Sequence, residues 1–135
     1  RPGKQTGAIR EMFGEEKIFG ITGKRISPCY SLPKMMWVKE NQPEVYEKTD
    51  KFLMGLDFLT FRLTGKAVTD YSMASGTMLF NISAKKWDEE IIEKCGLDIQ
   101  KLPEVACTGS VVGDILPDVA RELGEMNAQE CPLLE

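Results

Sequence analysis

The sequence predicts a single α/β or α+β domain over residues 1–135, made mostly of helices with short strands. Three observations support this fold class: apolar residues recur at helical spacing in several segments, short apolar runs lie between them, and glycines or prolines separate the segments. A chain of 135 residues is long enough to bury one hydrophobic core. It contains no internal repeat and no low-complexity tract.

The first half of the chain predicts helices bounded by glycine or proline. Ile9, Met12 and Phe13 share one side of the first helix, and further helices restart after prolines, so we expect helices over residues 4–14, 34–40, 44–48 and 56–64. Between them, the sequence suggests an extended or turn segment over residues 18–23 and a buried strand over residues 51–54.

The second half predicts two strands and two helices. Residues 66–69 suit a short strand, and the apolar run over residues 78–80 suits a buried one. Helical spacing, with acidic residues in the first turn and a closing glycine, predicts a helix over residues 86–95. A last short amphipathic helix is expected over residues 116–123, whereas residues 127–135 show little pattern.

Composition argues against several function classes. The net charge of -4, with acidic and basic residues interspersed, provides no basic stripe for nucleic acid. No apolar run approaches the ~18 residues that span a bilayer. The chain has no histidine, which removes Ser-His and Cys-His catalytic pairs. Its four cysteines lack metal-ligand spacing, so we interpret them as reduced thiols of a cytoplasmic protein.

The segment Thr-Asp-Tyr-Ser-Met-Ala-Ser-Gly-Thr-Met-Leu-Phe-Asn-Ile over residues 69–82 is the most informative one. It places the Asp70 carboxylate and the hydroxyl groups of Ser72, Ser75 and Thr77 around Gly76, directly before an apolar run. One interpretation is a self-capping turn that leads into a core strand, because these residue types readily bond nearby backbone. The other is a site where the backbone at Gly76 approaches a ligand closely.

Two long stretches resemble the FGGY family of carbohydrate kinases. They read PCYSLPKMMWVKENQPEVYEKTDKFLMGLDFLTFRLTGKAVTDYSMASGTMLFNI and KKWDEEIIEKCGLDIQKLPEVACTGSVVG, and the similarity runs from about Gly14 to Gly124. The resemblance implies part of a two-domain sugar kinase with an actin-like, ribonuclease-H-like fold. Such enzymes move the γ-phosphate of ATP to a sugar hydroxyl with Mg²⁺.

By that resemblance, the chain is the C-terminal part of the N-terminal, sugar-binding domain. The family's phosphate loop and catalytic aspartate are then expected outside it, so we expect no catalytic residue here and no activity from the isolated chain. The first residue, arginine, also suggests an internal piece. ATP and Mg²⁺ are expected for the parent but not for the fragment. The implied partners are a sugar, the rest of the kinase chain and a possible second copy in a homodimer.

The resemblance also provides candidate substrate-binding residues. They are Cys29, Tyr30, Asp57, Asp70, Ser75 and Gly76. Alternatives from the residues themselves are a small buried thiol at Cys29, surface packing at Tyr30 and a helix cap at Asp57. Glycerol kinases look to have tyrosine at the position of Cys29 and arginine at that of Gly76.

These two departures favour xylulose as the substrate, with gluconate or another ketose as further possibilities. The rival function is a non-catalytic interaction or structural domain derived from a sugar kinase. Such a domain would keep this fold segment without the catalytic parts.

Overall fold

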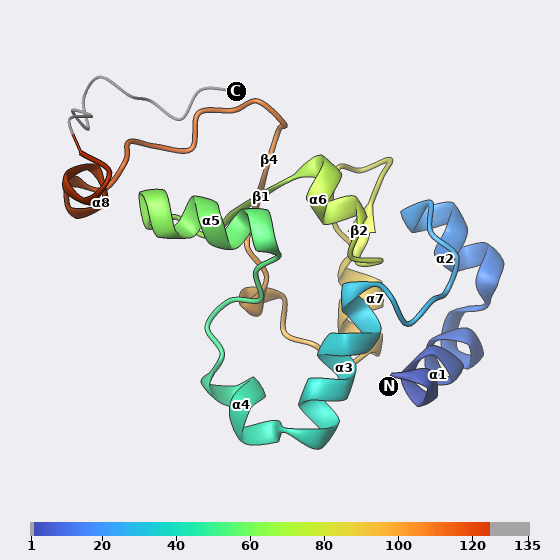
Figure 1. Cartoon of the computed structure of the whole chain (residues 1–135). Coiled ribbons are helices and arrows are strands. Elements are labelled where there is room, and N and C mark those ends of the chain that lie inside the picture. The colour runs from blue at the N-terminus through green and yellow to red at the C-terminus, as the bar shows by residue number, and fades with distance from the viewer. Residues whose placement is uncertain (1, 125–135) are drawn as a thin grey trace.

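The computed structural model describes residues 2–124, which form helices around two small sheets (Figure 1). The helices are α1 (Gly3–Phe13), α2 (Glu15–Thr22), α3 (Ser31–Asn41), α4 (Pro43–Lys48), α5 (Gly55–Thr64), α6 (Tyr71–Ser75), α7 (Glu89–Lys94), the 3₁₀ helix η1 (Ile99–Lys101) and α8 (Pro117–Glu122). The strands are β1 (Val68–Asp70), β2 (Phe80–Asn81), β3 (Lys86–Trp87) and β4 (Glu104–Ala106).

Two pairs of strands tie distant segments together. Strands β1 and β4 run parallel, with Val68 opposite Glu104 and Asp70 opposite Ala106. Strands β2 and β3 form an antiparallel pair that places Phe80 opposite Trp87. In Figure 1, α5 and α6 flank the β1–β4 sheet, and α8 lies at the far end of the molecule from α1 and α2.

The core lies where α1, α2, α3, α6 and α7 meet the β2–β3 pair. Met78 and Leu79 are fully buried at its centre, and Phe80 packs edge-on against Trp87 with ring centroids 6.0 Å apart. The apolar run over residues 78–80 is therefore core, as the sequence indicated. Burial of such side chains from water is the main stabilising contribution to this part of the fold.

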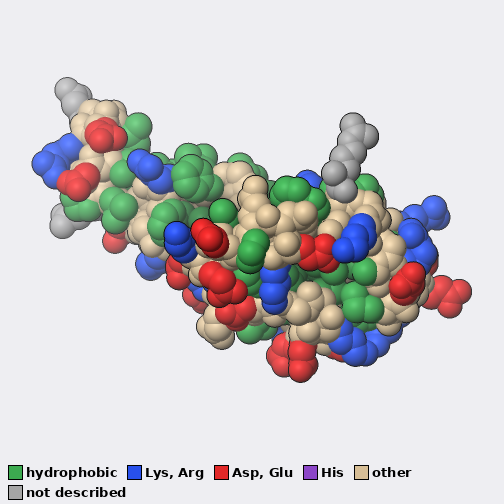
Figure 2. Space-filling model, turned by 90° about the horizontal axis from the view of Figure 1, so that it is seen from below, with side chains coloured by type: hydrophobic (Ala, Val, Ile, Leu, Met, Phe, Trp, Pro, Cys, Tyr) green, Lys and Arg blue, Asp and Glu red, His purple; other side chains and the backbone are tan. Residues whose placement is uncertain are grey.

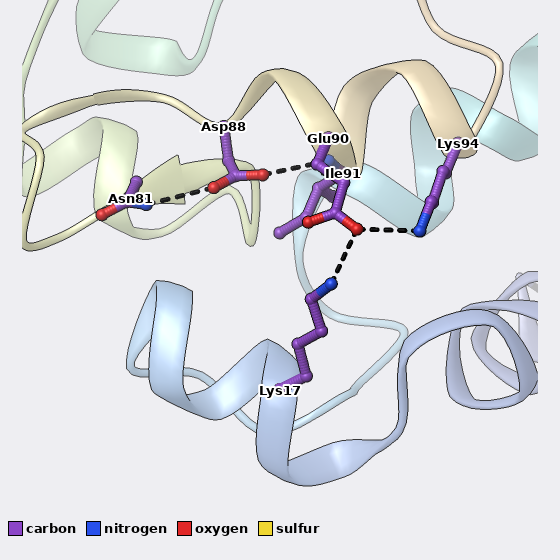
Figure 3. A network of polar contacts seen from close by, with 6 residues as sticks. All are labelled: Lys17, Asn81, Asp88, Glu90, Ile91 and Lys94. Atoms are coloured by element: carbon purple, nitrogen blue, oxygen red, sulfur yellow. Dashed lines mark hydrogen bonds and ion pairs between the residues drawn. The ribbon is translucent and has the colours of Figure 1, made fainter.

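An ion-pair cluster joins α2 to α7 on the surface beside this core (Figure 3). Glu90 accepts hydrogen bonds from the ammonium groups of Lys17 at 2.7 Å and Lys94 at 2.8 Å. Next to it, Asp88 caps α7 by accepting from the backbone N–H of Ile91 at 3.0 Å. The helix thus carries its acidic groups in the first turn, where the helix dipole favours them.

Most predicted helices are confirmed, and the strand predicted over residues 66–69 is present as β1, shifted to Val68–Asp70. The glycine stops behave as expected: the N–H of Gly14 bonds the carbonyl of Arg10 at 2.9 Å, and Gly65 ends α5 in the left-handed conformation. The predicted helix over residues 86–95 is shorter in the structure. Asp88 caps it, so α7 begins at Glu89 and the two residues before the cap form β3.

The extended or turn segment predicted over residues 18–23 is wrong, because this segment is the end of α2. Ile18 and Thr22 are buried one helical turn apart, and the Thr22 hydroxyl donates to the Ile18 carbonyl at 2.7 Å. Gly23 then closes the helix at φ 68°. Tertiary burial of Ile18 and Thr22 favours a helix in a segment whose glycines suggested a turn.

The strand predicted over residues 51–54 is also wrong. The segment is half-buried and joins neither of the sheets in the described part of the chain, and the N–H of Phe52 donates to the carbonyl of Lys101 in η1 at 2.8 Å. The strand expected over residues 78–80 is confirmed only at its end, as β2 begins at Phe80. Met78 has a φ of 66°, which interrupts an extended strand.

Candidate functional site

Asp57 is a buried carboxylate at the start of α5. Its side chain is 3% exposed, and Oδ2 accepts the backbone N–H of Met54 at 3.1 Å. The predicted capping role is therefore confirmed. Burial raises the pKa of the Asp57 carboxyl above its usual range, and the hydrogen bond from Met54 opposes that rise.

Asp70 is the last residue of β1 and caps α6. Its Oδ1 accepts the backbone N–H of Met73 at 2.7 Å, and its Oδ2 accepts the Thr108 hydroxyl at 3.1 Å. The negative charge of Asp70 contributes to the raised pKa of Asp57. The two carboxylates therefore belong to one electrostatic environment.

A recess of about 170 Å³, named the polar recess for its two carboxylates, brings Asp57 and Asp70 together. Apolar side chains line it as well: Leu56, Val68, Met73, Ala106 and Val112. It lies between α5, the carboxyl ends of β1 and β4, and the loop over residues 107–112. The buried Thr69 hydroxyl also lines the recess, and its proximity opposes the rise in the pKa of Asp57. Among residues 2–124, however, the Thr69 hydroxyl makes no hydrogen bond of normal geometry. Two carboxylates and several hydroxyls can accept and donate hydrogen bonds to a polyhydroxy ligand.

An apolar recess of about 190 Å³ lies on the other side of Asp57. Its wall is largely side chains from α3, the segment over residues 52–54 and the core, with Lys34 as its charged member besides Asp57. Thr77 lines it too, and the Thr77 carbonyl accepts the backbone N–H of Leu32 at 3.0 Å. Asp57 thus stands between a polar recess and an apolar one.

Ser75 and Gly76 face their own turn. The Ser75 hydroxyl donates to the carbonyl of Ser72 at 2.8 Å, as the self-capping interpretation predicted. Gly76 has a helical φ of -74°, and a Cβ built there would lie 3.2 Å from the carbonyl oxygen of Met73. The close approach suggested by Gly76 is therefore an approach to the chain's own backbone.

Cys29 and Tyr30 lie in the turn before α3 and are not among the residues that line the two recesses. Cys29 is exposed and its sulfur is 3.1 Å from the Ser27 hydroxyl, so the alternative of a buried thiol is wrong. Tyr30 is half-buried and packs against the core, with the Lys24 ammonium 6.0 Å from its ring centroid.

Sequence reasoning missed the loop over residues 107–112, which closes the polar recess and supplies Thr108 to Asp70. The signal was the polar run Thr-Gly-Ser at residues 108–110, but without a predicted β4 nothing placed it beside β1. Carboxyl ends of parallel strands share one edge of a sheet, which is a common place for binding sites. Among residues 2–124, no group of three or more His, Cys, Asp or Glu residues is arranged to hold a metal ion.

Two further observations concern the cysteines and the helices of the described residues. Cys29, Cys95 and Cys107 are free thiols, and burial raises the pKa of the Cys95 thiol to about 11; Cys131 lies outside the described residues. Within the described part of the chain, no helix is both long and apolar enough to cross a membrane.

Comparison with known proteins gives one consistent result. Residues 4–129 match the model of the FGGY family of carbohydrate kinases, N-terminal domain. The chain is 40% identical over 116 residues to the xylulose kinase of Bacillus subtilis, which is 86% of this chain and 23% of that protein. It is also 40% identical over 117 residues to the glycerol kinase of Thermococcus gammatolerans, covering 84% of this chain and 24% of that kinase.

A solved structure supports the same assignment. The ligand-bound xylulose kinase from Lactobacillus acidophilus superposes with a TM-score of 0.87 at 26% identity, over 98% of this chain and 27% of that one. The expected fold, part of an actin-like ATPase domain, is thereby confirmed. The chain spans about a quarter of the length of the proteins it matches. It belongs to the FGGY family of carbohydrate kinases, and its residues 4–129 match the N-terminal domain of that family.

Proposed function

We propose that the protein containing this chain is an ATP-dependent kinase that phosphorylates a hydroxyl of xylulose. The observation that carries this proposal is the 40% identity to a xylulose kinase over 86% of the chain. The departures at Cys29 and Gly76 from the pattern of glycerol kinases favour the same substrate. Since the chain spans about a quarter of its relatives, both the reaction and the substrate belong to the whole protein.

The role proposed for this chain is to orient the sugar within the N-terminal domain, of which it forms the C-terminal part. Phosphoryl transfer depends on positioning and charge stabilisation more than on a protein nucleophile. The polar recess offers the Asp57 and Asp70 carboxylates as hydrogen-bond acceptors for sugar hydroxyls. Cys29 and Tyr30 would contribute from the turn before α3, and Ser75 and Gly76 would shape the backbone beside Asp70.

ATP and Mg²⁺ are proposed for the parent protein only. Among residues 2–124, no group of three or more His, Cys, Asp or Glu residues is arranged to hold a metal ion. The rest of the kinase polypeptide, which is the partner of this chain, is proposed to bind the metal and the nucleotide. The isolated chain is proposed to have no kinase activity. Its free cysteines favour a cytoplasmic location for the whole protein.

Glycerol is the alternative substrate that a specific observation favours, namely the equal identity of 40% to a glycerol kinase. A non-catalytic domain derived from a kinase is the alternative from another class. An experiment can distinguish these two alternatives, because a glycerol kinase would be active as the full-length protein and a non-catalytic domain would not.

The test is a coupled ADP-release assay on the full-length protein with xylulose, gluconate and glycerol as separate substrates. We expect kcat/KM to be highest for xylulose and the isolated chain to release ADP at the background rate. A higher kcat/KM for glycerol than for xylulose would overturn the proposal that xylulose is the substrate. A full-length protein inactive with all three compounds would favour the non-catalytic alternative.

A further inference from the structure

The apolar recess beside Asp57 is a space that the proposed sugar site does not use. Its volume is about 190 Å³, and its wall is predominantly apolar. Side chains from four segments that are distant in sequence form much of this wall: Met35, Phe52, Trp87 and Leu102. All four are buried or half-buried, so packing with the core fixes their positions.

The size and lining of this recess suit a small apolar group. An engineered apolar cavity of about 150 Å³ stays dry and binds benzene. Small-molecule sites in proteins are generally apolar hollows with a few polar groups that orient the ligand. The apolar recess is therefore large enough for a group the size of a benzene ring, and the polar residues at its wall decide what else the ligand carries.

The side of the recess formed by α3 favours a negative charge. Ser31 and Lys34, from the first turn of this helix, both line the recess. The first turn contains no acidic residue, and the N-cap residue Tyr30 makes no side-chain cap, so no carboxylate offsets the helix dipole there. Lys34 is exposed, and among residues 2–124 its ammonium group makes no hydrogen bond or ion pair. An ammonium group and a helix N-terminus together attract an anion.

The other charged group of the recess limits where that anion lies. Asp57 is 3% exposed, and its Oδ2 already accepts the backbone N–H of Met54 at 3.1 Å. Because Asp57 repels a second negative charge, the anion belongs beside α3 and the apolar body of the ligand belongs beside Asp57. On the face shown in Figure 2, acidic and basic side chains are interspersed, so that face offers no broad positive surface as a competing anion site.

We propose that the apolar recess is a binding site for a small monocarboxylate whose apolar body is about the size of a benzene ring. The carboxylate pairs with Lys34 at the start of α3, and the apolar body occupies the space lined by Met35, Phe52 and Leu102. Asp57 lines both this recess and the polar recess, so the ligand lies beside a side chain that we propose to orient the sugar. Only this last consequence rests on the proposed function.

Benzoate is the probe for the charge of the ligand, and benzyl alcohol is its neutral analogue of similar size. Saturation-transfer NMR titrations on the full-length protein, at fixed ionic strength and without sugar or nucleotide, give the Kd of each. We expect Lys34→Gln to raise the Kd of benzoate about three- to tenfold, because the pair is exposed to water, and to leave that of benzyl alcohol unchanged. Lys48→Gln is the matched control, since Lys48 is exposed on α4 and does not line the recess.

Val38→Phe tests the recess itself. Val38 is half-buried on α3 and lines the recess, so a larger side chain there takes up part of its volume. We expect the Kd of both probes to rise at least about tenfold in a protein whose Tm stays close to that of the unchanged protein. Val45→Phe on α4 is the control, because Val45 is 53% exposed and does not line the recess.

Three results would overturn the inference. Absence of benzoate binding would show that the recess is closed in the full-length protein. A Kd that Val38→Phe leaves unchanged would place the bound probe elsewhere. Equal affinity for the two probes, or a Kd for benzoate that Lys34→Gln does not change, would refute the assignment of a carboxylate to the ligand. Because no sugar, nucleotide or turnover enters these titrations, an inactive protein that binds benzoate in the recess would refute the proposed function and keep this site.

Discussion

The indole N–H of Trp87 donates a hydrogen bond to the carbonyl oxygen of Pro103 at 2.8 Å, and both residues are buried. This contact connects β3 to the segment that leads into β4. It therefore joins the antiparallel pair in the core to the parallel sheet beside the polar recess, over 16 positions of sequence.

Trp87→Phe is expected to lower the free energy of unfolding by about 1–3 kcal/mol, because it leaves the buried Pro103 carbonyl without a partner. Thermal unfolding of the full-length protein would show a lower Tm. Trp37→Phe is the control, since the Trp37 indole nitrogen makes no hydrogen bond among residues 2–124. An equal decrease in Tm for both variants would contradict the role assigned to this hydrogen bond.

Glu90→Gln is expected to weaken the contact between α2 and α7 in a pH-dependent way. Hydrogen bonds from Lys17 and Lys94 lower the pKa of Glu90 to about 2 in the folded protein, from an ordinary value of 4.5. The stabilisation is thus fully present above about pH 4.5 and is lost as pH falls toward 2. Because the three side chains are 44–52% exposed, the difference in Tm should be small and should decrease with added salt.

The matched control for that change is Glu93→Gln on the same helix, where no ion pair is formed among the described residues. Its Tm should follow that of the unchanged protein from pH 3 to pH 7. If Glu93→Gln and Glu90→Gln behave alike, the ion-pair cluster does not stabilise the fold.

Asp57→Asn is expected to become relatively more stable as the pH rises. Burial raises the folded-state pKa of Asp57 above its ordinary value of 3.8, so between the unfolded and folded pKa values the folded protein holds more protons. Ionisation of Asp57 therefore reduces stability as pH rises through that window. The neutral amide avoids this loss, and the Tm difference, variant minus unchanged protein, should increase from pH 3.5 to pH 7. A difference that is constant or falls would contradict the burial argument.

Asp70→Asn and Asp88→Asn separate substrate binding from helix capping. Both aspartates cap short helices with similar hydrogen bonds, of 2.7 Å and 3.0 Å, but only Asp70 lines the polar recess. Since asparagine caps nearly as well as aspartate, both variants should keep their stability within about 1 kcal/mol of the unchanged protein. If the recess binds the sugar, Asp70→Asn should raise KM for xylulose by roughly tenfold or more, and Asp88→Asn should leave it unchanged. An equal KM for xylulose in the two variants would show that Asp70 does not bind the sugar.

The family, most of the helices and the central part of the core could be predicted from the amino-acid sequence alone. Glycines such as Gly14 and Gly65 and caps such as Asp57 and Asp70 act over one helical turn, so short-range pattern was sufficient to locate them. The apolar run at residues 78–80 is likewise buried, as its composition predicted, although its backbone is not a continuous strand.

How these pieces meet depends on contacts that form only in the folded chain. The polar recess exists because β1 pairs with β4, 36 residues further along the chain, which brings Thr108 to Asp70 and closes the space beside Asp57. Other long-range contacts, those of α2 with β2, accompany the burial of Ile18 and Thr22 in a helix. Local propensity cannot encode such features, because their energy comes from burial between segments that are distant in sequence.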